Sequence, residues 1–118
     1  MLLPLIAFIA LQHFSFLILE MFLWTRPIGL KVFRMSAEKA QITYSLAQNQ
    51  GLYNGFLAAG LAWSILETNP EFSRSLQYFF LSCVCAAGVI GGLTVNIRIF
   101  FIQSLPAIFA LILRAMSY

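Results

Sequence analysis

Four apolar segments, each close to 20 residues long, constrain the fold of this chain more than any other feature. They are residues 2–24, 47–66, 76–95 and 99–116. A helix needs about 20 apolar residues to cross the hydrocarbon of a bilayer. The composition agrees, since 61% of the 118 residues are hydrophobic and 9% are charged, against about 25% charged in a typical soluble domain. The sequence therefore predicts one integral membrane domain, residues 1–118, folded as an all-α four-helix transmembrane bundle.

Residues that start and end helices lie between the apolar segments. Thr25-Arg26-Pro27 ends the first span, because the residue before a proline is biased away from helical geometry. Thr68-Asn69-Pro70 supplies an N-cap and a first-position proline for the third span. Ser36 is the expected N-cap of the second helix, well before its apolar part begins. We therefore predict an extended second helix that projects beyond the bilayer, with residues 28–35 along the membrane surface.

Basic residues set the expected orientation. The connection 25–46 carries one acid, Glu38, and four basic residues. Arg98 lies on the same side in the predicted threading, whereas Arg74 and Arg114 lie on the other. Because basic residues near span ends favour the cytoplasm, loop 25–46 is predicted to be cytoplasmic and both termini outside. The expected location is the inner (plasma) membrane. The basic residues of the loop are Arg26, Lys31, Arg34 and Lys39.

Polar side chains interrupt the spans at one predicted depth, the cytoplasmic half of the membrane. His13 lies nearer mid-membrane, about 10 Å from Glu20 along the first helix. Ionisable groups inside spans are costly, and they usually face a protein interior or water. We therefore expect a polar pocket open to the cytoplasm, with His13 near its floor. The remaining members of this set are Glu20, Asn49, Gln50, Tyr53, Asn54, Asn96, Arg98 and Gln103.

The residue types suggest roles within this pocket. The candidate catalytic groups can donate or accept a proton, and they are His13, Glu20 and Tyr53. The candidate ligand-binding groups are amides and a guanidinium, and they are Asn49, Gln50, Asn54, Arg98 and Gln103. A simpler interpretation stays open, in which the amides bond across helices, Arg98 marks orientation and Glu20 pairs with it. The pattern identifies no cofactor.

Small residues at intervals of four offer a second kind of surface. Gly51, Gly55 and Ala59 are predicted to share a face opposite the polar residues, and Gly88 and Gly92 repeat the pattern in the third span. Such faces let helices approach closely, so a homo-oligomer formed through one of them is expected.

Two classes of site are not predicted. Cys83 and Cys85 are two residues apart, so on a helix they point in different directions and share neither a disulfide nor a metal. The basic loop is explained by membrane orientation, so no nucleic-acid partner is expected. A cleaved secretory signal is not expected either, because no basic residue precedes the first apolar run.

Three functions compete on this evidence from the sequence. The first is binding or transforming a small amphipathic molecule in the polar pocket within the bilayer, and the sequence does not decide whether a reaction occurs. The second is a proton-coupled small-molecule exporter, suggested by four spans and a lone acid in the first. The third is a structural or assembly subunit whose polar face contacts another membrane protein.

Several segments together resemble one known family. They are LEMFLWTRP (Leu19–Pro27), KVF (Lys31–Phe33), NQGLYNGFLAAGLAW (Asn49–Trp63) and QSLPAIFAL (Gln103–Leu111), in combination with His13. The chain is similar along almost its whole length to the small four-span family catalogued as domain of unknown function thirteen-oh-four. The resemblance implies no biochemical activity, but it places most of the candidate site residues in the family's signature segments.

A looser similarity is to the membrane-associated eicosanoid and glutathione metabolism proteins. Those are four-span trimers with an extended second helix and an Arg-Ala-His-x-Asn-x-x-Glu pattern. With their Asn aligned on Asn49, this chain has Ser45, Ala47 and Leu52 at the Arg, His and Glu positions. The resemblance therefore implies a similar architecture and no glutathione chemistry.

Overall fold

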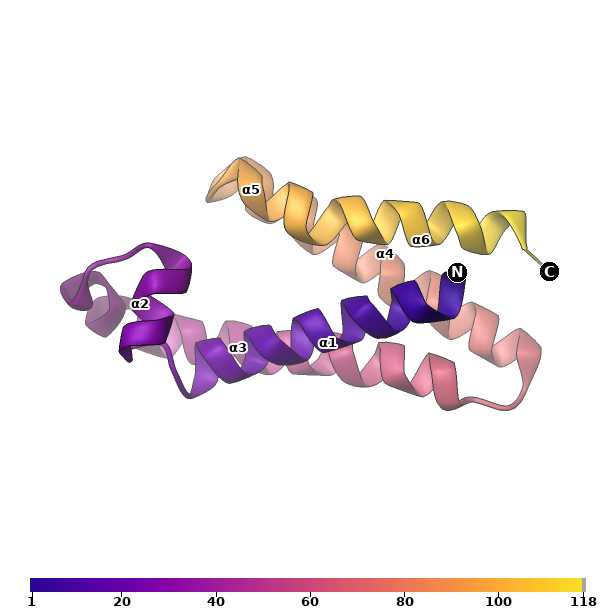
Figure 1. Ribbon diagram of the computed structural model, residues 1–118, viewed down its shortest axis with the longest axis horizontal. Helices are drawn as coiled ribbons and strands as arrows, with labels where there is room; N and C mark the ends of the chain where they lie inside the picture. Colours follow the sequence, from indigo (N-terminus) through magenta and orange to yellow (C-terminus); the bar gives the residue numbers. More distant parts are fainter. Residues whose placement is uncertain (118) are drawn as a thin grey trace. The chain divides into compact units, whose positions relative to one another are not determined.

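The computed structural model describes residues 1–117, which form helices joined by short connections and contain no strand. The chain divides into two compact units, one of residues 11–58 and the other of residues 1–10 with the described residues from 59 onward. The division lies inside α1 and α3, and each unit is described by itself. The elements are α1 (Leu2–Met21), α2 (Pro27–Phe33), α3 (Ala37–Leu66), α4 (Pro70–Thr94), α5 (Ile97–Ile99), the π-helix η1 (Phe100–Ser104) and α6 (Leu105–Met116) (Figure 1).

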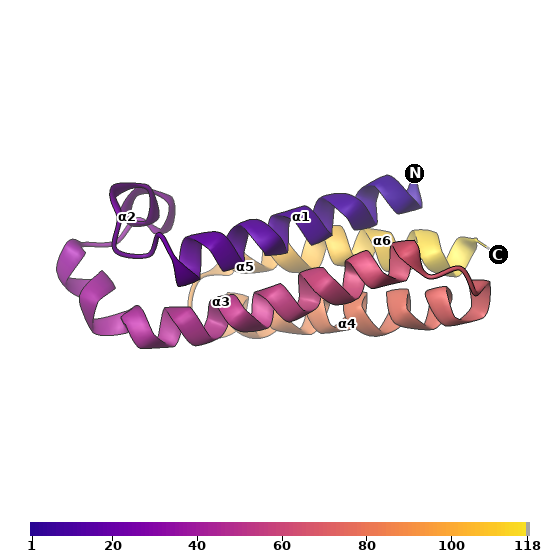
Figure 2. The ribbon, with the colours of Figure 1, turned by 90° about the horizontal axis from the view of Figure 1, so that it is seen from below.

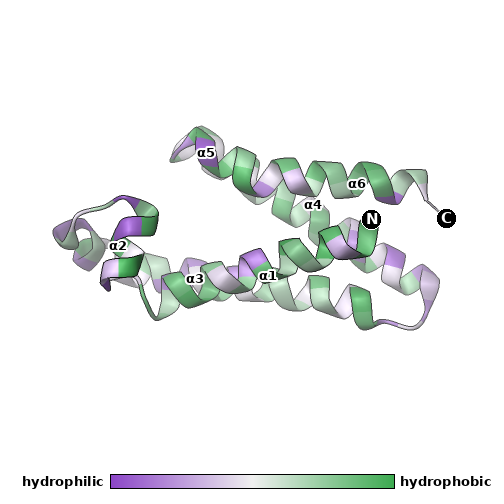
Figure 3. Ribbon diagram, in the orientation of Figure 1, coloured by the Kyte–Doolittle hydropathy of each residue, from purple (hydrophilic) through white to green (hydrophobic). Residues whose placement is uncertain are grey.

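Three helical stretches are long and apolar enough to cross a membrane. They are Leu2–Met21, Pro70–Thr94 and Ile97–Met116, and each overlaps a predicted span. Hydrophobic colouring dominates α1, α4 and α6, whereas hydrophilic colouring is frequent in the connections on either side of α2 (Figure 3). The predicted span 47–66 lies within α3, which is long enough but is not among the three. An all-helical membrane protein is thus the class that the structure supports, and the fourth crossing stays a prediction.

The segment between α1 and α3 forms a short helix that folds back on the end of α1. α2 begins at Pro27 and ends before Arg34, which has a left-handed backbone with φ of 52°. A Cβ on Gly29 would lie 2.7 Å from the carbonyl oxygen of Trp24, so only glycine fits there. The rings of Trp24 and Phe33 lie 4.8 Å apart, centroid to centroid, and close this turn.

α3 starts where the sequence predicts. The hydroxyl of Ser36 accepts a hydrogen bond from the backbone N–H of Lys39 at 3.1 Å, which confirms Ser36 as the N-cap. Thr43 donates to the carbonyl of Lys39 at 2.7 Å and accepts from the indole N–H of Trp24 at 3.0 Å. The first turns of α3 are therefore tied to the connection that follows α1.

α1 and α3 pack closely because two glycines of α3 leave room for the other helix (Figures 1 and 2). A Cβ on Gly51 would lie 2.7 Å from Cγ of Met21 and 3.0 Å from Cβ of Glu20. A Cβ on Gly55 would overlap the side chain of Leu17. Small residues at such a contact let two helix backbones approach each other, and here they bring α3 against the last turns of α1.

α4 is capped by Asn69, one of the two predicted candidates. Its side-chain oxygen accepts from the N–H of Phe72 at 3.1 Å, and Pro70 occupies a first-turn position. Both features were expected of a helix start. The connection from α3 is short, so α4 turns back directly after Leu66.

α4 and the segment α5–η1–α6 form an antiparallel hairpin within the second unit (Figure 2). The hydroxyl of Ser104 donates to the carbonyl of Cys85 at 2.7 Å. A Cβ on Gly88 would lie 2.6 Å from the backbone nitrogen of Ser104, and a Cβ on Gly91 would lie 2.7 Å from Cγ2 of Ile99. The glycines of α4 therefore receive the neighbouring helix of the same hairpin.

Candidate functional site

Glu20 is the centre of a polar cluster in unit 11–58. It lies one residue before the end of α1, and 2% of its surface is exposed. The side-chain amide of Asn54 donates to its Oε1 at 2.5 Å, and the amide of Gln50 donates to its Oε2. Each carboxyl oxygen therefore has an amide partner from α3. We call these three residues the Glu20 cluster.

Helix geometry explains why α3 supplies both amides. Gln50 and Asn54 are four residues apart, so they lie on one face, one turn above the other. Gly51 lies beside them and brings the backbone of α1 within reach of their short side chains. Asn54 is 6% exposed, whereas Gln50 is exposed. The cluster is thus buried at Glu20 and Asn54 and reachable at Gln50.

The cluster has more hydrogen-bond acceptors than donors. Both amide nitrogens bind Glu20, and within the described residues the two amide oxygens receive no hydrogen bond. A carboxylate also has about four acceptor positions, of which two are occupied here. The arrangement can accept hydrogen bonds from a cationic or N–H-rich group. In the described part of the chain, no group of three or more His, Cys, Asp or Glu side chains could hold a metal ion.

The predicted distribution of polar residues around the second helix is wrong in one respect. Asn49, Gln50, Tyr53 and Asn54 were expected on one face, opposite the glycines. Instead, Asn54 and Gly51 both contact α1, because residues three apart lie on the same face of a helix. Asn49 and Tyr53 are exposed, so α3 divides these four polar side chains into two pairs.

Within the described residues, no hydrogen bond joins Tyr53 to the Glu20 cluster. Its ring is 56% exposed and lies 5.8 Å from that of Phe56, centroid to centroid. Asn49 is exposed one turn earlier on the same helix. These two residues belong to the outward face of α3.

His13 is fully buried, and its ring meets the edge of Phe16 at a centroid distance of 5.4 Å. It precedes Glu20 by seven residues on α1, which separates the two side chains by nearly two turns, about 10 Å. His13 and Glu20 therefore do not form a hydrogen-bonded pair.

Arg98 and Gln103 belong to the other unit. Arg98 is exposed, and both its backbone N–H and its Nε donate to the side-chain oxygen of Asn96, at 2.9 and 3.4 Å. Gln103 lies in η1, half-buried, where its Cβ would be 3.0 Å from a Cβ on Gly88. The convergence of these two residues with Glu20 in one pocket stays a prediction.

The π-helix explains the unusual backbone around Gln103. The N–H of Leu105 bonds to the carbonyl of Phe100, five residues back. Pro106 follows and has no N–H with which to continue an α-helical pattern. π-turns of this kind are frequently found at functional sites.

The glycine faces are occupied within the chain, which corrects the expectation that they are free for self-association. Gly51 and Gly55 face Met21 and Leu17, and Gly88 receives Ser104. Gly92 is covered by Phe100, since a Cβ there would lie 2.8 Å from that residue's Cβ. Ala59, the third member of the first stripe, is exposed.

A chain of polar side chains in the second unit was not predicted from the sequence. Gln77 is 2% exposed in α4, and its side-chain oxygen accepts from Nη1 of Arg114 at 2.9 Å. The amide nitrogen of Gln77 donates to the hydroxyl of Ser73 at 3.4 Å, and Ser73 donates to the carbonyl of Ser64 at 2.5 Å. An amide within an apolar run and an arginine near a span end were the available signals.

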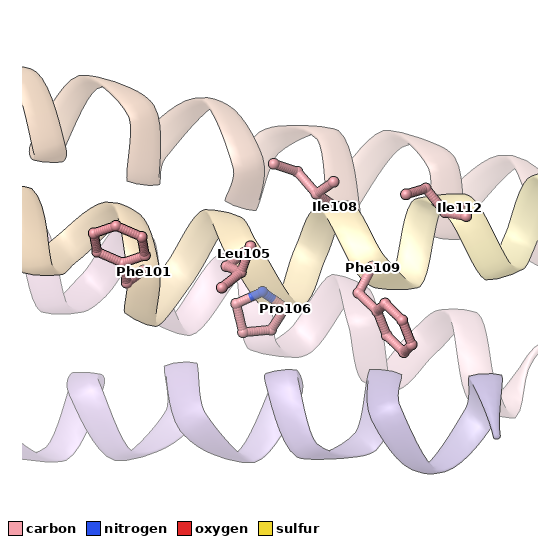
Figure 4. A pocket seen from close by; sticks show the side chains of 6 residues that line it. All are labelled: Phe101, Leu105, Pro106, Ile108, Phe109 and Ile112. Carbon is pink, nitrogen blue, oxygen red and sulfur yellow. The ribbon is translucent and has the colours of Figure 1, made fainter.

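A pocket on η1 and α6 is lined entirely by apolar side chains and has a volume of about 420 Å³ (Figure 4). Its lining offers no side-chain hydrogen-bonding group. It is lined by Phe101, Leu105, Pro106, Ile108, Phe109 and Ile112.

Comparison with known proteins places the sequence in a family. The family described as "Protein of unknown function (DUF1304)" matches residues 7–115. The chain belongs to this family. It is also 30% identical over 106 residues to the "Uncharacterized protein YpaA" of Lactococcus lactis subsp. lactis (strain IL1403), covering 88% of this chain and 87% of that protein. No solved structure matches the chain. The family match over residues 7–115 includes all candidate site residues, and it assigns no activity to them.

Proposed function

We propose that this chain is a multi-pass membrane protein that binds a small amphipathic molecule through the Glu20 cluster. The observation that carries the proposal is a buried carboxyl group, Glu20, held by two carboxamides of a second helix. Leaving such a group inside an apolar region is costly, and intramembrane ionisable residues commonly mark ligand or ion pathways.

The acceptor excess of the cluster indicates the head group of the ligand. Two amide oxygens and the remaining lone pairs of Glu20 would be satisfied by a donor-rich cation, such as a primary ammonium. Glu20 lies next to the end of a candidate span, Leu2–Met21. A head group bound there would leave an apolar tail within the bilayer, which is why we propose an amphipathic ligand.

The test uses dodecylamine as the probe, with dodecanol as its uncharged analogue. The protein is reconstituted in phosphatidylcholine nanodiscs, and partitioning of each probe is measured by equilibrium dialysis against empty discs. Wild type should bind dodecylamine in excess of dodecanol, and Glu20→Gln should weaken the amine by about tenfold.

Glu38→Gln is the matched control, because it removes the same charge from an exposed residue of α3 in the same unit. Its affinity for dodecylamine should equal that of wild type. Equal binding of dodecylamine by wild type and Glu20→Gln would refute the proposal.

A proton-coupled exporter is the second candidate, because Glu20 is a lone acid within the candidate span of α1. Addition of a lipophilic cation such as tetraphenylphosphonium to the purified protein should then release protons, and Glu20→Gln should abolish the release. Proton release without retained dodecylamine would favour this alternative.

We further propose four crossings, with α3 as the second, both termini outside and loop 25–46 in the cytoplasm. The charge distribution of the sequence supports this orientation. Self-association is proposed through surfaces other than Gly51, Gly55, Gly88 and Gly92, since these glycines already contact the chain's own side chains.

A further inference from the structure

Within residues 1–117, two arginines at one end of the α4–α6 hairpin form no ion pair with an acidic side chain. Arg74 lies near the start of α4, and Arg114 lies two residues before the end of α6. The two helices run antiparallel, so these ends lie together (Figures 1 and 2). Nη1 of Arg74 donates to the carbonyl of Ser117 at 3.3 Å, while Nη1 of Arg114 donates to Gln77.

The guanidinium of Arg114 is held in a fixed direction. Its acceptor, Gln77, is oriented by a hydrogen bond of 3.4 Å from its amide nitrogen to the hydroxyl of Ser73, which in turn donates to Ser64. Gln77 is 2% exposed. An arginine that merely snorkels would extend its head into water, whereas Arg114 folds onto a buried amide.

The same guanidinium retains unused donors. Nε of Arg114 is buried and has no hydrogen-bond partner, and of the five N–H groups that an arginine carries, Gln77 receives one. Arg74 precedes Gln77 by three residues, so it shares that face of α4. Within residues 1–117, one N–H of each guanidinium is bonded, so both arginines retain donors at this end of the hairpin.

The acidic residues nearest to Arg74 in the sequence are Glu67 and Glu71. Glu67 accepts from the indole of Trp63 at 3.2 Å and from the N–H of Asn69 at 3.1 Å. Glu71 is in the first turn of α4, where its charge complements the helix dipole. Within residues 1–117, neither arginine has an acidic group within ion-pairing distance.

We propose that Arg74, Arg114 and Gln77 form a binding site for a phosphate-bearing anion, supplied by a phospholipid head group. The planar fork of a guanidinium matches phosphate oxygens in a bidentate manner. Both arginines lie near ends of candidate spans, Pro70–Thr94 and Ile97–Met116, which is where phospholipid phosphates lie in a bilayer. This site is separate from the Glu20 cluster and does not depend on the function proposed for it.

The experiment measures lipid retained by the protein. Wild type and variants are reconstituted in nanodiscs of phosphatidylcholine with one-tenth phosphatidylglycerol, extracted in mild detergent and analysed by native mass spectrometry. Wild type should retain phosphatidylglycerol, and Arg74→Gln and Arg114→Gln should each lower its retention by about fivefold. Arg98→Gln is the matched control, because it removes the same charge from an exposed residue and should retain lipid as wild type does.

Arg114→Lys tests for a purely structural effect, because it keeps the positive charge and loses the planar guanidinium. It should retain phosphatidylglycerol at a level between wild type and Arg114→Gln.

A competition experiment with inorganic phosphate distinguishes a lipid head group from a free anion as the bound phosphate. Displacement by millimolar phosphate would assign the site to a free anion and overturn the lipid assignment. Unchanged retention in the folded Arg74→Gln and Arg114→Gln proteins would overturn the site itself.

Discussion

Each partner of Glu20 satisfies a carboxyl oxygen that would otherwise be buried in an apolar contact. Removing one hydrogen-bond partner from a buried polar group costs about 1–3 kcal/mol, and more when the group is charged. Asn54 is nearly as buried as Glu20, and its contact is direct at 2.5 Å. The Glu20–Asn54 pair therefore contributes more to the free energy of unfolding than the exposed Gln50 does.

Asn54→Leu is predicted to destabilise the fold by about 1–3 kcal/mol, because Glu20 loses one of its two amide partners. The measurement is the free energy of unfolding in mixed micelles, followed by circular dichroism. Asn49→Leu is the control, since Asn49 is exposed on the same helix, and its effect should stay within about 0.5 kcal/mol. A double-mutant cycle with Glu20→Gln should show a coupling of about 0.5–3 kcal/mol, and zero coupling would contradict the contact.

Gly88→Ala is predicted to destabilise the α4–α6 hairpin more than Gly91→Ala does. A methyl at residue 88 would lie 2.6 Å from the backbone nitrogen of Ser104, which moves only with its helix. A methyl at residue 91 meets the side chain of Ile99, which can rotate. Overpacking of this kind costs about 1–3 kcal/mol. Thermal unfolding of both variants measures the difference, and equal loss would show that the backbones are not in contact.

Sequence reasoning identified the members of the Glu20 cluster but not their geometry. Ionisable and amide groups stand out in apolar segments by composition alone, so Glu20, Gln50 and Asn54 were found. The facing of α3 was wrong, because the glycines and Asn54 were assigned opposite sides when both contact α1. Gln77 was missed because a single amide in an apolar run has no local signature of its partner on a helix 37 residues away.

Among the elements, α3 is distinctive because its start is set by a local cap and its packing by glycines. Ser36 closes its first turn, and Gly51 and Gly55 set its approach to α1. The first turns of α3 carry several exposed residues and depend on the cap and on Thr43. This part of the helix is therefore the most sensitive to a capping substitution.

Ser36→Ala is predicted to weaken the start of α3 by about 0.5–2 kcal/mol, because the N–H of Lys39 loses its acceptor. Hydrogen exchange of the amides of residues 37–40 should accelerate, while exchange in the middle of α3 should not change. Ser45→Ala provides the comparison, since Ser45 is exposed within the same helix and should leave exchange unaltered. Equal protection in Ser36→Ala and wild type would mean that the cap contributes nothing in solution.

The helix boundaries were predictable and the π-helix was not. Caps and first-position prolines act within a few residues, so Ser36, Asn69 and Pro70 could be identified from the sequence. Pro106 lacks the N–H that would continue an α-helical pattern, which is a local signal for irregular backbone before it. The actual π-turn also involves the fit of Ser104 against Gly88, and that contact joins residues distant in the chain.

For the whole molecule, the main question is whether α3 crosses the membrane. Its length is sufficient, but its polar residues keep it outside the set of helices apolar enough to span on composition alone. The Glu20 cluster lowers the cost of burying Gln50 and Asn54, because their amide hydrogens are paired. Pairing of this kind is what permits polar residues within a membrane-embedded helix, so the contact with α1 favours a crossing that hydropathy alone does not predict.

The four-span threading and a three-span threading place residues 68 and 95 on opposite sides of the membrane. With loop 25–46 in the cytoplasm, a crossing α3 places Thr68 outside and Val95 inside, whereas a non-crossing α3 places them on the opposite sides. Both residues are exposed.

Single cysteines at residues 68 and 95, in a background with Cys83 and Cys85 replaced by alanine, can be labelled with a membrane-impermeant maleimide on spheroplasts. Thr68→Cys should label directly and Val95→Cys should label after permeabilisation alone. Lys39→Cys lies in the cytoplasmic loop of either threading and should need permeabilisation in both. The reverse pattern at residues 68 and 95 would show that α3 stays at one surface, and the Glu20 cluster would then lie at the edge of the bilayer rather than between two spans.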